Sequence, residues 1–219
     1  MQETEQSKKW AGDFGDNYID RNPKNVQELD ELYMKNFGLT RTSLNQEFLT
    51  DLSKDIKILE VGSNVGAQLI SLQNLDFKDL TGIEISEKAI EESKKLSKNI
   101  YFLKASALDL PFKDNFFDLV FTSGVLIHIH PQDLNKVIDE IYRTTKKYIW
   151  CYEYFSENCK EIEYRENKNL LWKNNFMKLF LEKHPHLKII KEKKIKYLDS
   201  DNIDHMFLLE KSREENEIL

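Results

Sequence analysis

The first residues that could do chemistry form a glycine-rich loop with a carboxylate in front of it. Glu60 stands near the end of the apolar run Ile56–Val61, and Gly62-Ser63-Asn64-Val65-Gly66 follows. Glycine allows a tight turn and a close approach of the backbone to a ligand, and Asn tolerates positive φ better than most residues. A carboxylate here repels a pyrophosphate and attracts a cation. The loop therefore predicts a ligand that carries positive charge, held by Glu60, Gly62, Asn64 and Gly66.

Two phosphate-binding motifs are related to this loop but do not fit it. A dinucleotide fingerprint has glycine at positions 62 and 64 and Gly or Ala at position 67, and Asn64 breaks that pattern although Ala67 fits it. A P-loop requires Gly-Lys-Ser/Thr after the glycine-rich stretch, and this sequence has none there. Both comparisons disfavour a loop that cradles phosphates.

A second carboxylate stands at the end of the next expected strand. Glu84 and Ile85 close the run Leu80–Ile85, and Ser86 is the expected N-cap of a helix over Glu87–Leu96. A carboxylate at a strand end can accept hydrogen bonds from both hydroxyls of a ribose. One acidic strand end is usually only solvated, whereas two that are separated by one helix favour a shared nucleoside ligand.

The elements that position these residues alternate between strand and helix. Helices are expected over Val26–Leu52 with a break at Gly38, over Gly66–Leu75, over Glu87–Leu96 and from Pro131 onward. Strands are expected at Ile56–Val61, Leu80–Ile85, Ile100–Leu103, Phe117–Thr122 and Tyr148–Tyr154. This alternation predicts a mostly parallel sheet with helices on both faces.

The last part of the chain breaks the alternation. Leu187–Tyr197 and Ile203–Glu210 are expected strands, and only Asp199-Ser200-Asp201-Asn202 links them, so they must be antiparallel. We therefore expect one α/β domain over residues 1–219 that ends in an antiparallel hairpin. Within it we expect an N-terminal helical lid or attachment over residues 1–52 and a helical insertion over residues 155–185.

The motifs resemble those of the class I methyltransferases that use S-adenosylmethionine (SAM). The stretch from Glu60 to Gly66 is similar to their motif I, with Asn64 in place of the middle glycine. The parallel sheet that ends in an antiparallel hairpin is also a signature of this class. The resemblance implies a Rossmann-like fold, SAM as cofactor and S-adenosylhomocysteine as product, with Glu60 near the cationic groups of SAM and Glu84 on its ribose.

Two further stretches extend this resemblance. Ser106-Ala107-Leu108-Asp109-Leu110-Pro111-Phe112 is similar to a segment of small-molecule methyltransferases whose aspartate binds the adenine amino group. That aspartate falls on Ser106, so either its hydroxyl or the Ala107 backbone takes the contact, and Leu108 covers the ring. The stretch from Phe117 to Ile129 resembles motif IV, which places Ser123 at the cofactor end of its strand.

The flanks are similar to a narrower family, the methylases associated with pseudaminic acid biosynthesis. The similar stretches are Trp10–Asn22, Glu161–Arg165 and Leu170–Phe176. The resemblance implies O- or N-methylation of a small molecule, namely a sugar or sugar nucleotide of a nonulosonic-acid or surface-glycan pathway. The aromatic and basic residues of these flanks are the substrate candidates: Tyr18, Arg21, Tyr164 and Arg165. The alternative is that Trp10, Phe14 and Tyr18 are the apolar side of a helix that packs on the core.

Two residues are candidates for a general base. His128 follows the fourth strand and titrates near neutrality, and Glu153 stands at the end of the fifth. A purely structural role is open for His128, because related methyltransferases often carry a histidine there beside the start of a helix.

The composition and charge of the chain disfavour several classes of binding partner. The net charge of −6 disfavours long nucleic acid, because duplex binding depends on Lys and Arg that neutralise phosphates. No apolar run approaches a membrane span, no secretory signal is visible, and two cysteines cannot form a zinc site alone. We expect a cytoplasmic enzyme with no metal and no membrane partner, in an oligomeric state that the sequence leaves open. The alternatives are a SAM-binding regulatory subunit without catalysis, or an RNA or protein methyltransferase.

Overall fold

The computed structural model describes residues 4–212, and residues 1–3 and 213–219 of the expected domain lie outside this part. Its centre is a seven-stranded sheet with the order β3-β2-β1-β4-β5-β9-β8. Neighbouring strands from β3 to β5 are parallel, whereas β9 is antiparallel to both β5 and β8. The strands are β1 (Lys57–Val61), β2 (Asp79–Glu84), β3 (Tyr101–Lys104), β4 (Phe117–Ser123), β5 (Thr145–Tyr154), β8 (Leu187–Lys196) and β9 (Ile203–Lys211).

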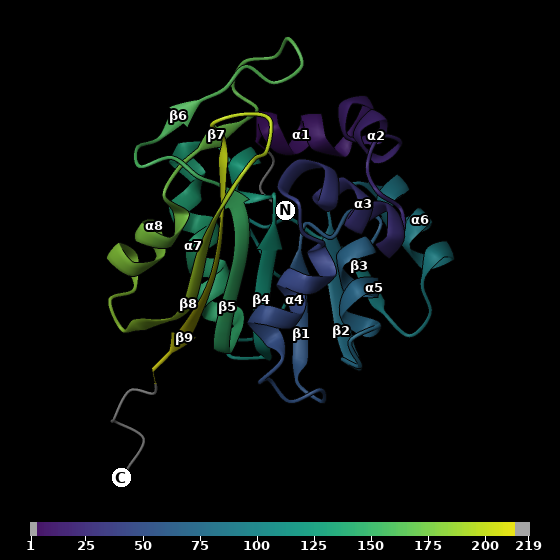
Figure 1. The fold of residues 1–219 in the computed structure, drawn as a ribbon, viewed down its shortest axis with the longest axis vertical. Helices are drawn as coiled ribbons and strands as arrows, with labels where there is room; N and C mark the ends of the chain where they lie inside the picture. The colour runs from purple at the N-terminus through teal and green to yellow at the C-terminus, as the bar shows by residue number, and fades with distance from the viewer. Residues whose placement is uncertain (1–3, 213–219) are drawn as a thin grey trace.

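Helices cover both faces of this sheet (Figure 1). One apolar cluster joins the sheet to α3 (Val26–Phe37), α4 (Arg41–Leu49), α5 (Ala67–Gln73) and α6 (Glu87–Leu96). A second cluster joins the other face to α7 (Pro131–Thr144) and α8 (Phe176–Lys183). Both layers are needed because successive strand residues point to opposite faces, as Ile58 and Leu59 do in these two clusters. The expected fold, a mostly parallel sheet with a final antiparallel pair, is confirmed.

Local signals in the sequence set several element ends. Ser86 caps α6 by accepting a hydrogen bond from the Ala89 N–H, and Pro131 opens α7. Gly38 ends α3 in the left-handed conformation at φ 72°. A short 3₁₀ helix, η1 (Leu126–His128), lies between β4 and α7. Within residues 4–212 no helix combines the length and apolarity of a membrane span.

The first residues form two short helices, which we call the N-terminal cover: α1 (Glu5–Ala11) and α2 (Asp13–Ile19). They lie across the carboxyl ends of the parallel strands (Figure 1). Trp10, Phe14 and Tyr18 have the spacing of one helix, but the chain breaks at Gly12, which is extended at φ −109°. The two helices then pack so closely that a Cβ on Gly15 would lie 1.9 Å from the Trp10 carbonyl oxygen.

The insertion at residues 155–185 differs from the helical segment that we expected. Only Phe176–Lys183 is α-helical, and a two-stranded sheet of β6 (Lys160–Glu161) and β7 (Trp172–Lys173) precedes it. Arg165, Glu166 and Asn169 have positive φ, which a helix does not allow. Trp172 and Phe176 are four residues apart, yet they do not share a helix, because Trp172 lies in β7.

Candidate functional site

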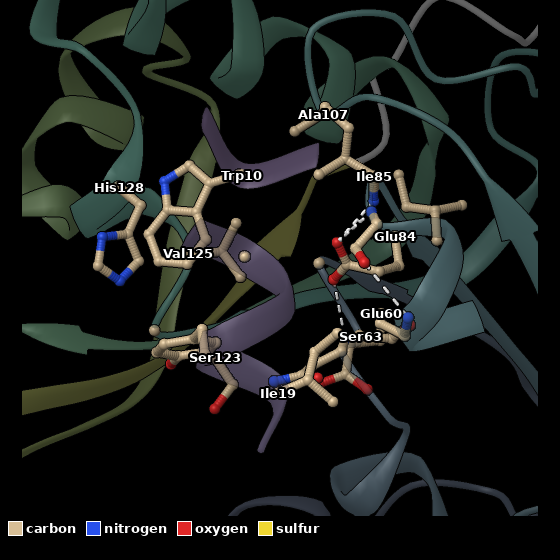
Figure 2. A pocket seen from close by; sticks show the side chains of 18 of the residues that line it. Trp10, Ile19, Glu60, Ser63, Glu84, Ile85, Ala107, Ser123, Val125 and His128 are labelled. Carbon is tan, nitrogen blue, oxygen red and sulfur yellow. Dashed lines mark hydrogen bonds between the residues drawn. The ribbon is translucent and has the colours of Figure 1, made fainter. Parts of the chain in front are cut away.

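A cavity lies at the carboxyl ends of β1, β2 and β4, beneath the N-terminal cover. Glu84, Ile85 and Ala107 lie at one end of it and Trp10 and His128 at the other (Figure 2). Every cofactor residue expected from the sequence lines this cavity except Gly66. Gly66 instead begins α5 at φ 82°, where a Cβ would lie 2.7 Å from the Phe102 ring.

The loop after β1 has the left-handed backbone that its residue types predict. Gly62 has φ 74° and Asn64 has φ 47°, both in the left-handed region. A Cβ on Gly62 would lie 2.6 Å from a methyl of Val125 in the loop after β4. The Gly62 and Ser63 N–H groups both donate to the Ile83 carbonyl, at 2.9 and 2.8 Å. The glycine therefore allows two loops of the cavity wall to meet.

Glu84 ties three backbone amides together at the end of β2. Its Oε1 accepts hydrogen bonds from Ile85 N–H at 2.6 Å and Ser86 N–H at 3.0 Å, and its Oε2 accepts one from Asn64 N–H at 2.9 Å. Burial raises the pKa of this carboxyl, and the amides oppose that rise. A carboxylate has about four acceptor positions, so Oε2 keeps one for a ligand hydroxyl.

Glu60 is a buried carboxyl in the cavity wall whose hydrogen bonding is incomplete. Its side chain is buried, and its Oε2 has no hydrogen-bond partner among the described residues. Burial raises the pKa of this carboxyl well above its ordinary value, the Arg41 guanidinium opposes the rise and Glu84 adds to it. A ligand with a cationic donor would satisfy this oxygen and favour its ionised form.

Arg41 is a cavity residue that the sequence analysis missed. It lines the cavity although it is only 1% exposed. Its Nε donates to Asn45 Oδ1 at 3.0 Å and its Nη1 to the Tyr33 hydroxyl at 2.7 Å. One feature of the sequence could have identified Arg41: it is a charged residue at the spacing of the apolar face of a helix. In the structure α4 buries Arg41 and Asn45 beside Leu44, Phe48 and Leu49.

His128 lies in the cavity wall with a fixed ring. Its Nδ1 is 2.7 Å from the Leu170 carbonyl oxygen, and the Trp10 ring lies 4.4 Å from its own. Because a carbonyl can only accept, the proton is on Nδ1 and Nε2 is the free acceptor. Burial lowers the pKa of His128 to about 4, so the imidazole is neutral at physiological pH.

Glu153, the second base candidate, does not line the cavity. It is buried, and its two oxygens accept hydrogen bonds from Val125 N–H at 3.1 Å and Ile127 N–H at 3.3 Å. Burial raises the pKa of this carboxyl to about 7. The structure therefore gives Glu153 a supporting position, behind the loop that carries Ser123 and His128.

The four substrate candidates separate into two pairs. Tyr18 lines the cavity, and Tyr164 of the insertion packs its ring 5.5 Å from that of His128. Arg21 and Arg165 are exposed and do not line the cavity. The guanidinium of Arg165 lies over the Tyr164 ring at 5.7 Å.

The N-terminal cover is held down from both sides. Lys9 Nζ donates to Asn167 Oδ1 of the insertion at 2.7 Å, and the Phe14 ring lies 6.2 Å from Tyr164. On the other side the Ser86 hydroxyl donates to Asp16 at 3.2 Å. The two flanks thus meet over the cavity, which restricts the access of water to it.

Part of this chain is similar in sequence to known methyltransferases. Residues 59–151 match a family model described as a methyltransferase domain. An uncharacterized Haemophilus influenzae protein is 28% identical over 132 residues, which are 54% of this chain and 53% of that protein. Cycloartenol-C-24-methyltransferase 1 of Oryza sativa is 30% identical over 108 residues, which are 44% of this chain and 31% of that protein. The chain thus spans between about a third and half of these relatives.

Solved structures extend the similarity to most of the chain. A Pyrococcus horikoshii protein has a TM-score of 0.68 and 19% identity, with 90% of this chain and 99% of that chain covered. A methyltransferase of Burkholderia thailandensis, crystallised with 1,6-didemethyltoxoflavin and S-adenosylhomocysteine, has a TM-score of 0.63 and 12% identity, with 78% and 76% covered. The fold is that of the class I methyltransferases. The stretch from Glu60 to Gly66 lies within the residues that the methyltransferase model matches.

Proposed function

We propose that this protein is an enzyme that transfers a methyl group from SAM to a small-molecule acceptor. The observation that carries the proposal is the Glu60 carboxylate, whose buried Oε2 has no partner beside the Gly62 loop. A buried polar atom without a partner is costly, and a cationic donor removes that cost. SAM carries such donors on the same molecule as a ribose, and Glu84 lines the same cavity.

We assign a group of cavity residues to each part of SAM. Glu84 would hold the ribose, Ser106, Ala107 and Leu108 the adenine, and Glu60 the ammonium group. When it is bound, SAM supplies an electrophilic methyl group to a nucleophile that approaches in line. Catalysis then rests mainly on orientation, which contributes roughly 7–11 kcal/mol in favourable cases. The cover and the insertion exclude water, and His128 Nε2 is the atom that would take a proton from a hydroxyl acceptor.

For the acceptor we propose a sugar ring. Its support is the resemblance of the flanks to glycan-associated methylases, together with the aromatic residues Trp10, Tyr18 and Tyr164 that these flanks bring to the His128 end. The cavity gives no support for a diphosphate inside it, because Arg41 is its single Lys or Arg among the described residues. We therefore expect the sugar to enter, with any nucleotide part outside.

Two measurements test the proposal. Calorimetry should detect SAM and S-adenosylhomocysteine binding in the micromolar range, and no binding of nicotinamide dinucleotides; binding of NAD without SAM contradicts it. Incubation with labelled SAM and a panel of free sugars and sugar nucleotides, read by mass spectrometry, then identifies the acceptor. A protein that binds SAM and methylates nothing in the panel or in extracts supports the regulatory alternative.

A further inference from the structure

Arg41 is a buried cation whose bonding is incomplete. Two of its nitrogen atoms have neutral partners, Asn45 and Tyr33, and its Nη2 has none among the described residues. A buried guanidinium nitrogen without an acceptor is costly. The contacts to Tyr33 and Asn45 suffice to fix α4 against α3, but they do not explain a third, unpaired nitrogen on a side chain that lines the cavity.

Two acceptors in the same wall are also without partners. Gln68 lines the cavity, and its Nε2 donates to Asn45 Oδ1 at 2.9 Å, the atom that Arg41 Nε also contacts. That bond leaves Gln68 Oε1 unpaired, as Glu60 Oε2 is. One unpaired cationic donor and two unpaired acceptors thus share a wall. Their chemistry is complementary to an α-amino acid, whose carboxylate accepts and whose ammonium donates.

The Arg41 guanidinium also contacts Tyr152 of β5, which is hydrogen-bonded to Asp204 of β9. It lies 4.5 Å from the centre of the Tyr152 ring, and the Tyr152 hydroxyl donates to Asp204 Oδ2 at 2.6 Å. Asp204 is 2% exposed and lies on β9, far from α4 in the sequence. A hydroxyl has one proton to donate, so this bond fixes the phenol under the guanidinium.

We propose that Arg41, Glu60 and Gln68 form a subsite for the α-amino-carboxylate end of the cofactor, with Asp204 as a positioning residue that acts on Arg41 through Tyr152. The proposal rests on the proposed use of SAM. It assigns part of cofactor recognition to α4 and β9, which lie outside the matched residues 59–151.

A pair of ligands tests the subsite by calorimetry. S-adenosylhomocysteine has the amino-acid end, and 5′-methylthioadenosine has the same adenosine without it. Arg41→Gln should weaken S-adenosylhomocysteine binding at least tenfold and leave 5′-methylthioadenosine within threefold. Arg41→Lys keeps a cation and serves if Arg41→Gln does not fold; its loss should be smaller but equally selective. Glu47→Gln, an exposed charge removal on the same helix, should change neither ligand.

The role of Asp204 is tested by the same comparison of affinities for S-adenosylhomocysteine and 5′-methylthioadenosine. Asp204→Ala removes the acceptor of the Tyr152 hydroxyl, so it should weaken S-adenosylhomocysteine three- to tenfold with 5′-methylthioadenosine unchanged, and should add no loss on top of Arg41→Gln. Asp204→Asn keeps an acceptor for that hydroxyl and should bind both ligands as the wild type does. Equal losses of affinity for both ligands in Arg41→Gln would make Arg41 a structural residue and overturn the subsite. No loss of affinity for either ligand would also overturn it. A full additional loss in the double variant would overturn the route through Arg41. If the wild-type protein binds neither SAM nor S-adenosylhomocysteine, the proposed function fails first, and independently of these variants.

Discussion

Glu84 Oε2 accepts a hydrogen bond from the Asn64 N–H at 2.9 Å, so one side chain at the end of β2 holds the loop that follows β1. Its other oxygen accepts from Ile85 and Ser86. A strand-end carboxylate that only read a ribose would contribute little to the fold of the free protein. Here it is also the partner of three backbone amides, and each buried amide without a partner costs about 1–3 kcal/mol.

We therefore predict that Glu84→Ala has two effects. It should weaken S-adenosylhomocysteine binding about ten- to hundredfold, because charge-assisted hydrogen bonds contribute roughly 1.5–3 kcal/mol. It should also lower the midpoint of thermal unfolding without ligand by several degrees. Calorimetry and a thermal scan on one preparation measure both. An unchanged midpoint of thermal unfolding would mean that water replaces Glu84 as the acceptor for the three amides. An unchanged affinity for S-adenosylhomocysteine would show that Glu84 does not bind the cofactor.

The second prediction concerns the pH dependence of cofactor binding. The pKa of Glu60 is raised by burial, and a cationic ligand beside it would lower that pKa. Binding should therefore release a proton from Glu60, and affinity should increase as the pH rises through the raised pKa. Titrations in buffers of different ionisation heat measure the proton. In Glu60→Gln both the affinity and the proton release should fall; an unchanged release would assign the proton to another group.

The sequence predicted the parts of this site that depend on local order. Glu60, Glu84 and the glycine loop follow strand ends, and parallel strands present their carboxyl ends at one edge, so spacing alone brought them together. Arg41 could not be placed in this way, because its contact with the cavity depends on how α4 packs on the sheet. Only its position within an apolar helical stripe marked it as unusual.

The direction of a side chain at a strand end could not be predicted from the sequence either. Glu153 was predicted as a base because it stands at the end of the fifth strand, yet both its oxygens accept hydrogen bonds from the amides of Val125 and Ile127. The insertion was predicted to be helical, whereas Trp172 pairs in β7 and only Phe176 begins α8. The spacing of apolar residues predicts which of them can share a face of a helix or strand. It does not predict whether they form a helix or a strand where tertiary contacts determine the secondary structure.

The third prediction concerns the ring of His128. Its pKa of about 4 and the contact of its Nδ1 with the Leu170 carbonyl predict a neutral imidazole with the proton on Nδ1 from pH 5 to 8. Long-range ¹H–¹⁵N spectra of histidine-labelled protein report both properties, and His128→Gln assigns the signal. A proton on Nε2 would rule out the free acceptor in the cavity, and titration near the ordinary value of about 6.5 would contradict the effect of burial on the pKa.

The fourth prediction separates the two residues of the insertion. Tyr164→Ala removes the ring beside His128 and Phe14, so it should reduce turnover of the identified acceptor on the order of tenfold. Arg165→Ala removes only an exposed charge, so turnover should stay within about twofold. Both variants should keep their affinity for SAM within about threefold, or ~0.7 kcal/mol. The reverse order, with Arg165 more important, would place the acceptor on the outer face of the insertion.

The last prediction concerns stability and pH. Burial raises the pKa of Asp204 from about 3.8 to about 7, although the Tyr152 and Tyr197 hydroxyls oppose the rise. Below about pH 4 the carboxyl is protonated in the folded and the unfolded chain alike. Between the two values only the unfolded chain ionises, so the stability that this group contributes is lost as pH rises and is constant above about 7.

Asp204→Asn cannot ionise, so its thermal midpoint should rise relative to wild type between pH 5 and pH 8. The change should be on the order of 2 kcal/mol, because each pKa unit corresponds to about 1.4 kcal/mol. For a protein of this size 1 kcal/mol shifts the midpoint by roughly 2–4 °C, so the effect is measurable by scanning calorimetry without ligand. Asp201→Asn, a fully exposed carboxylate in the same hairpin, is the matched control and should show no such trend. A wild-type midpoint that rises relative to Asp204→Asn over this range would show that Asp204 is ionised in the folded protein.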